Sequence, residues 1–113
     1  MTSPLPERVS NERIIEAPET RLVLDKRMVG KFPIGATTVS VLNVEYWIAQ
    51  NTGAVTITNF TNGQEGQHLY IQGDGNTTLQ QGATIETIAG ANLLLANNKA
   101  YHFVRLSNVW RQI

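Results

Sequence analysis

The feature that most constrains the fold is a series of short runs rich in β-branched and aromatic residues, separated by turn-forming residues. Glycine falls at positions 53, 63, 66, 73, 75, 82 and 90, followed by Asn97-Asn98 and Ser107-Asn108. Turn signals at intervals of about eight to twelve residues indicate an all-β sandwich or barrel. The runs between the turns cover residues 38–42, 45–49, 54–60, 68–72, 77–79, 84–88, 92–96, 101–106 and 109–112.

Several of these runs alternate apolar and polar residues with a period of two. In one run, Val55 and Ile57 alternate with Thr56 and Thr58. This is the pattern of a half-buried strand, and no window shows sustained helical periodicity. The sequence therefore predicts an all-β fold of short antiparallel strands, arranged as a sandwich or a β-prism.

The composition changes near Gly35, and we place a domain boundary there. Residues 1–35 carry eleven of the eighteen charged side chains and all four prolines, whereas Asn, Thr, Gln, Ser and Gly make up nearly half of residues 36–113. Proline disfavours helix interiors and central strands, so residues 1–35 are predicted to form an extended N-terminal attachment arm. Residues 36–113 are predicted to be a β-rich module.

The arm contains apolar residues that it cannot bury by itself. They are Leu5, Val9, Ile14 and Ile15. One interpretation is a partly disordered tail, as chain termini often are. The functional interpretation is a docking strap that uses these four side chains and orders on a partner surface or around its own oligomer.

Charge and composition exclude several classes of protein. Nine basic and nine acidic side chains give no net charge, which argues against nucleic acid and anionic membranes as partners. No apolar run is long enough to span a membrane, and the N-terminus lacks the apolar core of a signal peptide. We therefore expect synthesis in the cytoplasm. The absence of cysteine excludes disulfides and Cys-type zinc sites.

Short strands of this kind bury little apolar surface within one chain, which favours a core shared between subunits. Leu93-Leu94-Leu95 breaks the alternation and places apolar groups on both faces of a strand. We interpret it as a subunit interface in preference to a two-sided core within one chain. The residues predicted to form the subunit interface or core are Trp47, Val55, Ile57, Leu69, Ile71, Leu93, Leu94, Leu95, Phe103 and Trp110.

Four segments, in this order, resemble a module of phage tail fibres, tailspikes and related virion appendages. They are Glu45–Ala49 with Gly53–Thr58, then Gly66–Ile71, then Gly73–Leu79, and finally Tyr101–Ile113, which resembles a closing hairpin. The resemblance covers residues 45–113. It implies a homotrimer of β-rich subunits around a three-fold axis, located on the virion, with residues 36–113 as the trimerising module.

The chain begins with methionine and ends after one such module. This favours a capsid decoration (cement) protein or a short fibre over a long fibre. We therefore expect a structural virion protein, made in the bacterial cytoplasm, whose partners are itself and the capsid or tail proteins that its arm contacts. The alternative is a receptor-binding module that recognises a host surface glycan.

The candidate site residues also have ordinary structural interpretations. His68 and His102 are not a His-x-His pair, and each is interpreted as a surface or packed histidine, although a ring of three copies of one histidine around a trimer axis stays open. Gly73–Asn76 is predicted to be a tight turn, because the further acidic ligands of a calcium loop are missing. Trp47 and Trp110 are predicted core anchors, which leaves Tyr70 as the candidate for glycan contact.

The acidic residues of the β-rich segment are scattered singly among turns, without a partnered nucleophile. We expect no catalytic residues, no metal site and no cofactor. The predicted role is structural.

Overall fold

The computed structural model describes residues 28–113, and the predicted docking residues Leu5, Val9, Ile14 and Ile15 lie outside this range. All regular elements in the described part are strands, which confirms the all-β prediction. No helix there is long and apolar enough to cross a membrane. The strands are β3 (Val29–Lys31), β4 (Thr38–Ser40), β5 (Tyr46–Ile48), β6 (Val55–Ile57), β7 (Asn59–Thr61), β8 (His68–Gln72), β9 (Thr77–Leu79), β10 (Ile85–Glu86), β11 (Leu93–Leu94), β12 (Ala100–Leu106) and β13 (Val109–Gln112).

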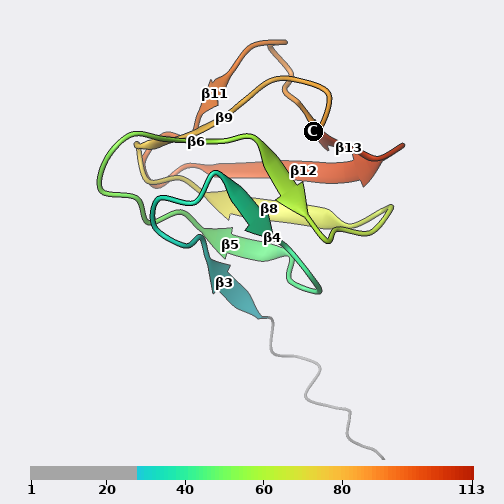
Figure 1. The fold of residues 1–113 in the computed structure, drawn as a ribbon, viewed down its shortest axis with the longest axis horizontal. Coiled ribbons are helices and arrows are strands. Elements are labelled where there is room, and N and C mark those ends of the chain that lie inside the picture. Colours follow the sequence, from blue (N-terminus) through green and yellow to red (C-terminus); the bar gives the residue numbers. More distant parts are fainter. Residues whose placement is uncertain (1–27) are drawn as a thin grey trace, which may run out of the picture.

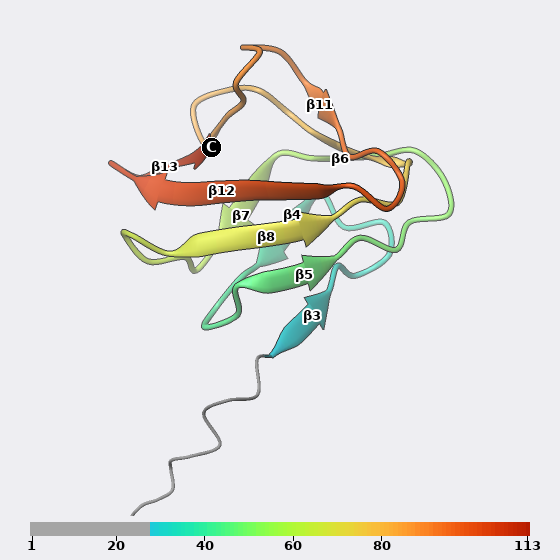
Figure 2. The same cartoon turned by 180° about the vertical axis from the view of Figure 1, so that it is seen from behind.

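The strands form three sheets arranged in two layers (Figures 1 and 2). A six-stranded sheet has the order β10-β13-β12-β8-β5-β3. A three-stranded sheet, β11-β9-β6, and a two-stranded sheet, β4-β7, make up the other layer. In Figure 1, β4 crosses in front of the six-stranded sheet, and in Figure 2, seen from behind, β4 and β7 lie behind it.

The prediction of antiparallel strands is wrong for most of the pairings. The β3–β5, β5–β8, β4–β7, β6–β9 and β10–β13 pairs are parallel, and only β8–β12, β12–β13 and β9–β11 are antiparallel. The reason is that the chain alternates between the layers, so most turns join strands of different sheets. Each of the five parallel pairs joins strands between which the chain passes through the other layer, and a parallel pair requires such a crossover connection.

Two local features show how turn chemistry controls these connections. Residues 54–60, expected as one run, split into β6 and β7, and the first pairs with β9 while the second pairs with β4. The hairpin between β12 and β13 turns at Ser107 and Asn108, whose φ values are 57° and 64°. Two successive positive φ values are characteristic of the type I′ turn, whose twist matches that of the flanking strands.

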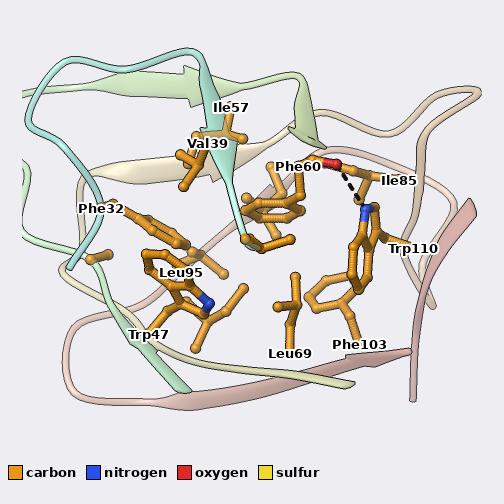
Figure 3. Close-up of a cluster of buried hydrophobic side chains, with 14 residues drawn as sticks. Phe32, Val39, Trp47, Ile57, Phe60, Leu69, Ile85, Leu95, Phe103 and Trp110 are labelled. Atoms are coloured by element: carbon orange, nitrogen blue, oxygen red, sulfur yellow. Dashed lines mark hydrogen bonds between the residues drawn. The ribbon is translucent and has the colours of Figure 1, made fainter. Parts of the chain in front are cut away.

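The hydrophobic core lies between the two layers (Figure 3). Trp110 is fully buried, and its indole Nε1 donates a hydrogen bond of 3.1 Å to the Phe60 carbonyl of the opposite layer. A Cβ atom added to Gly63 would lie 2.2 Å from Trp110 Cζ2, so only glycine fits beside this ring. Trp47 is also buried and donates from Nε1 to the Val44 carbonyl at 3.0 Å. Both tryptophans are core anchors, as predicted.

Most residues predicted for the interface or core belong to this intrachain core. Those that are buried are Trp47, Ile57, Leu69, Ile71, Leu95, Phe103 and Trp110, whereas Val55 and Leu93 are half-buried. Leu94 alone of the ten is exposed, at 52%. The leucine run is therefore explained largely by one chain, because Leu95 fills the core and Leu93 packs against it.

The folded module begins before the boundary expected near Gly35. Strand β3 pairs with β5 through Val29–Lys31, and Phe32 is buried in the core at 1% exposure. The composition misses this start because β3 is a short edge strand that contains the exposed, charged Lys31. The change in composition near Gly35 therefore does not mark the start of the fold.

Candidate functional site

The candidate site is the outer face of the six-stranded sheet, the face directed away from the two small sheets. Side chains alternate between the faces of a strand, so every second residue of β5 and β8 points outward. In β8, Leu69 and Ile71 are buried, whereas His68, Tyr70 and Gln72 are not. In β5, Trp47 is buried between two half-buried neighbours.

Strand register aligns five residues into a row across this face. Val29 lies opposite Tyr46, Tyr46 opposite Tyr70, and Tyr70 opposite His102. Ile113 continues the row, because its N–H donates to the His102 carbonyl at 2.9 Å. We call these five residues the outer row. Its two ends are exposed apolar side chains, Val29 at 57% and Ile113 at 62%.

The middle of the outer row is a ladder of stacked rings. The Tyr46 and Tyr70 rings are 4.9 Å apart with an interplanar angle of 15°, and the Tyr70 and His102 rings are 4.2 Å apart at 16°. Tyr70 is thus held between two rings, which occupy both of its faces. A sugar ring therefore has no free face of Tyr70 on which to stack, unlike the arrangement that the sequence suggested.

His68 joins the ladder from the neighbouring row. His102 lies opposite Tyr70 and His68 opposite Val104, which makes the two histidines diagonal neighbours on β8 and β12. His68 Nδ1 and His102 Nε2 are 2.7 Å apart, within hydrogen-bonding distance. Burial lowers the pKa of His102, the neighbouring His68 lowers it further, and Glu45 acts in the opposite direction.

A shallow groove runs beside the ladder. Its volume is about 310 Å³. The outward-facing residues that line it are Val29, Tyr46, Ile48, Tyr70, Gln72 and Ala100. These side chains are mostly apolar, so the groove is suited to an apolar surface more than to a charged ligand.

Charged side chains lie at the other end of the same face. Arg111 on β13 forms an ion pair with Glu86 on β10, and both side chains are substantially exposed. Such exposed pairs contribute little to stability. Among residues 28–113, no group of three or more His, Cys, Asp or Glu side chains is arranged to hold a metal ion.

The Gly73–Asn76 segment is a tight turn, as predicted. Asp74 Oδ1 accepts hydrogen bonds from the N–H groups of Asn76 and Thr77, and Oδ2 accepts from the Asn51 N–H and from Thr77 Oγ1, all at 2.7–2.8 Å. Burial raises the pKa of Asp74, but these four donors outweigh it and hold the pKa below its ordinary value. All four donors belong to the chain itself, so the role of the Asp74 carboxylate is structural.

The sequence did not predict which rings lie beside Tyr70. Tyr46, His68 and His102 come from three strands far apart in the chain. The available signal was their spacing, because residues 68, 70 and 72, like 46 and 48, share one face of a strand. That signal does not reveal which strands are neighbours or how they align.

The model of a family described as the phage depolymerase C-terminal beta sandwich domain matches residues 32–111. No curated protein and no solved structure matches the chain. The matched range contains nearly all of the strands described above and begins at the buried Phe32.

Proposed function

The chain belongs to the phage depolymerase C-terminal β-sandwich domain family, and from this membership we propose that it is a structural module of a bacteriophage tail appendage that assembles as a homotrimer. The family supports a virion protein related to tail appendages. It does not itself choose between a short fibre and a decoration protein, and we favour the short tail appendage because of the depolymerase relationship. The outer row of the six-stranded sheet is the proposed contact between copies.

The observation that carries this proposal is the apolar character of the outer row. A sheet packed on one side normally presents polar residues to water on the other. Here, the outward row places two large exposed aliphatic side chains, Val29 and Ile113, at the ends of a ladder of three rings. An apolar stripe with few charges is the composition expected at the centre of a protein interface.

Size exclusion with light scattering of the tag-free chain tests the assembly. We expect a mass of three chains that persists on dilution, and a monomer at every concentration would refute the trimer. Val29→Glu and Ile113→Glu should each weaken association, since each places a charge in the apolar contact without disturbing the core.

Leu94→Glu is the matched control. Leu94 is about as exposed as Val29 but lies on β11 of the opposite layer. It should leave the mass unchanged. If Leu94→Glu dissociates the protein while the two outer-row variants do not, the contact lies at the leucine run and the outer row is not the interface.

Attachment to the particle is assigned to the N-terminal arm. Leu5, Val9, Ile14 and Ile15 are its proposed contacts with tail or capsid proteins. Deletion of residues 1–27 should leave a folded trimer that no longer joins particles, because β3 and all the described core residues lie after this segment. Normal incorporation of the deleted chain would contradict this role.

Recognition of a host surface glycan is the second candidate. The groove beside Tyr46 and Tyr70 supports it, because its volume of about 310 Å³ is sufficient for a small ligand. The two functions compete, since a trimer contact through the outer row would cover the groove. Saturable binding of the protein to host cells or lipopolysaccharide, abolished by Tyr46→Ala, would favour the glycan, whereas unchanged adsorption of phage lacking the protein would favour the structural role.

A further inference from the structure

We propose that the hydrogen-bonded pair of His68 and His102 makes the contact between chains pH-dependent, so that the contact forms at neutral pH and opens when both imidazoles are protonated. The inference rests on the proposed contact through the outer row, to which His102 belongs, and adds the regulation of that contact. The chain has only two histidines, so histidine titration between pH 5 and pH 8 belongs to this pair.

The geometry of the pair is the first support. His68 Nδ1 and His102 Nε2 are 2.7 Å apart, and the ring centroids are separated by 4.9 Å. Two nitrogens at this distance need a hydrogen between them, because two facing lone pairs would repel each other. In the neutral pair, one imidazole therefore donates its N–H and the other accepts with its lone pair.

The pair takes up protons in two steps that have opposite effects on this hydrogen bond. The first proton binds the free nitrogen of the donating ring and leaves the shared hydrogen bond in place, now with a charged donor. After the second proton, both facing nitrogens carry hydrogen, and two positive charges lie side by side. No hydrogen bond between the rings is then possible, so the second proton drives them apart.

Separation of the two rings would disturb the outer row. His102 stacks on Tyr70 with 4.2 Å between the ring centroids, and Tyr70 stacks on Tyr46 at 4.9 Å. A charged His102 that turns toward water leaves this stack and uncovers one face of the Tyr70 ring. If it stays in a contact between chains, it loses its hydration there, which disfavours the charged form. Protons and the neighbouring chain therefore compete for the same surface.

The charged groups around the pair act in both directions. Burial lowers the pKa of His102 below its ordinary value of 6.5, the neighbouring His68 lowers it further, and Glu45, just before β5, raises it. Arg111 on β13 lies in the same row as His68, and its charge is paired with that of Glu86 on β10. Because the net shift of the His102 pKa is downward, the contact should be complete above pH 7 and should be lost as the pH falls below 6.5.

Sedimentation equilibrium of the tag-free full chain between pH 8 and pH 5, at constant ionic strength, tests the proposal. We expect a trimer at pH 8 whose association constant falls below pH 6.5 by up to about a thousandfold per pH unit, because each of three chains must release one proton to associate. Circular dichroism at each pH checks that the chain stays folded. Ring ¹⁵N NMR follows the pair directly and should show two separate protonation steps, with contacts to Tyr70 lost in the second.

The double variant His68→Asn/His102→Gln removes the titrating groups and keeps a hydrogen bond. The asparagine amide takes the position of Nδ1 and the glutamine amide that of Nε2, and neither amide titrates. The association constant of this variant should not depend on pH between 5 and 8. Glu45→Gln should shift the dissociation of the otherwise unchanged chain to lower pH, because Glu45 raises the pKa of His102.

The outcomes separate this regulation from the proposed function. A trimer of equal strength at pH 8 and pH 5 would overturn the regulation and leave the proposed function standing. A pH dependence that persists in the double variant, or two histidines that titrate independently of each other in the NMR experiment, would also overturn the regulation alone. A monomer at every pH would overturn both.

Discussion

Replacing Asp74 by Asn should destabilise the protein strongly, although the change is nearly isosteric. The carboxylate accepts four hydrogen bonds, two from Thr77 and one each from Asn51 and Asn76. An asparagine side chain has one oxygen and one NH₂ group, so at least two of the four donors would face another donor. Thr77 is fully buried and Asn51 is 5% exposed, which leaves these donors little access to replacement water.

The magnitude follows from the bonds that are lost. A hydrogen bond to a charged group contributes about 1.5–3 kcal/mol, and Asp74 itself is partly solvated, which reduces the total. Loss of two such bonds should lower the free energy of unfolding by about 2–4 kcal/mol. For a domain of this size, that corresponds to a decrease in Tm of roughly 10–20 °C.

The effect should depend on pH in a defined direction. The pKa of Asp74 in the folded protein lies below its ordinary value of 3.8. The stabilisation is therefore complete above about pH 4 and is lost as the pH falls through the lowered folded-state pKa. The difference in stability between the parent and Asp74→Asn should be constant near neutral pH and should shrink below pH 4.

Urea unfolding at fixed protein concentration measures this difference, since association would otherwise alter the apparent stability. Glu86→Gln is the control, because it removes a carboxylate from an exposed ion pair and should cost less than about 1 kcal/mol. The reasoning fails if Asp74→Asn unfolds at the same urea concentration as Glu86→Gln, or if its effect is as large at pH 3 as at pH 7.

Two further changes test the core and the closing hairpin. Gly63→Ala places a Cβ 2.2 Å from an atom of the Trp110 ring, and it should lower the free energy of unfolding by about 1–3 kcal/mol. The control Gly53→Ala, where space is open, should change it by no more than about 0.5 kcal/mol. Equal Tm values for the two variants in thermal unfolding would contradict the packing of Trp110 against Gly63. The N–H groups of Ser107 and Asn108 donate to the Glu65 carboxylate and hold its pKa below the ordinary value. Glu65→Gln should therefore accelerate amide exchange at these two residues above pH 5. Unchanged exchange would show that the carboxylate does not hold the turn.

The sequence predicted where strands form but not how they pair. All of the runs identified from β-branched residues and turns contain a strand, because both signals are local. Whether two strands pair in parallel or antiparallel depends on connections that are not local in the sequence. Spacing alone suggested hairpins, whereas β5 and β8 are parallel neighbours because β6 and β7 lie between them in the chain and pack in the opposite layer.

Burial was predictable to a similar extent. Trp47 and Trp110 were expected as anchors because large aromatic side chains dominate small cores, and both are buried. The buried Phe32 was missed, since the charged residues before Gly35 concealed an edge strand. A polar composition indicates side chains that are exposed to water, and an edge strand has more exposed positions than a central strand.

The sequence and the structure point to different surfaces for contact between chains, because local patterns do not show which strands are neighbours. A run such as Leu93-Leu94-Leu95 is conspicuous in the sequence, yet two of its members are accounted for by a single chain. The outer row has no two adjacent residues in the sequence, and its members look like isolated apolar or aromatic positions in separate strands. They form a stripe only because the register aligns them. A pattern within one segment of the sequence therefore cannot predict an apolar surface that is built across strands. The register of the six-stranded sheet makes the outer row a candidate for contact between chains.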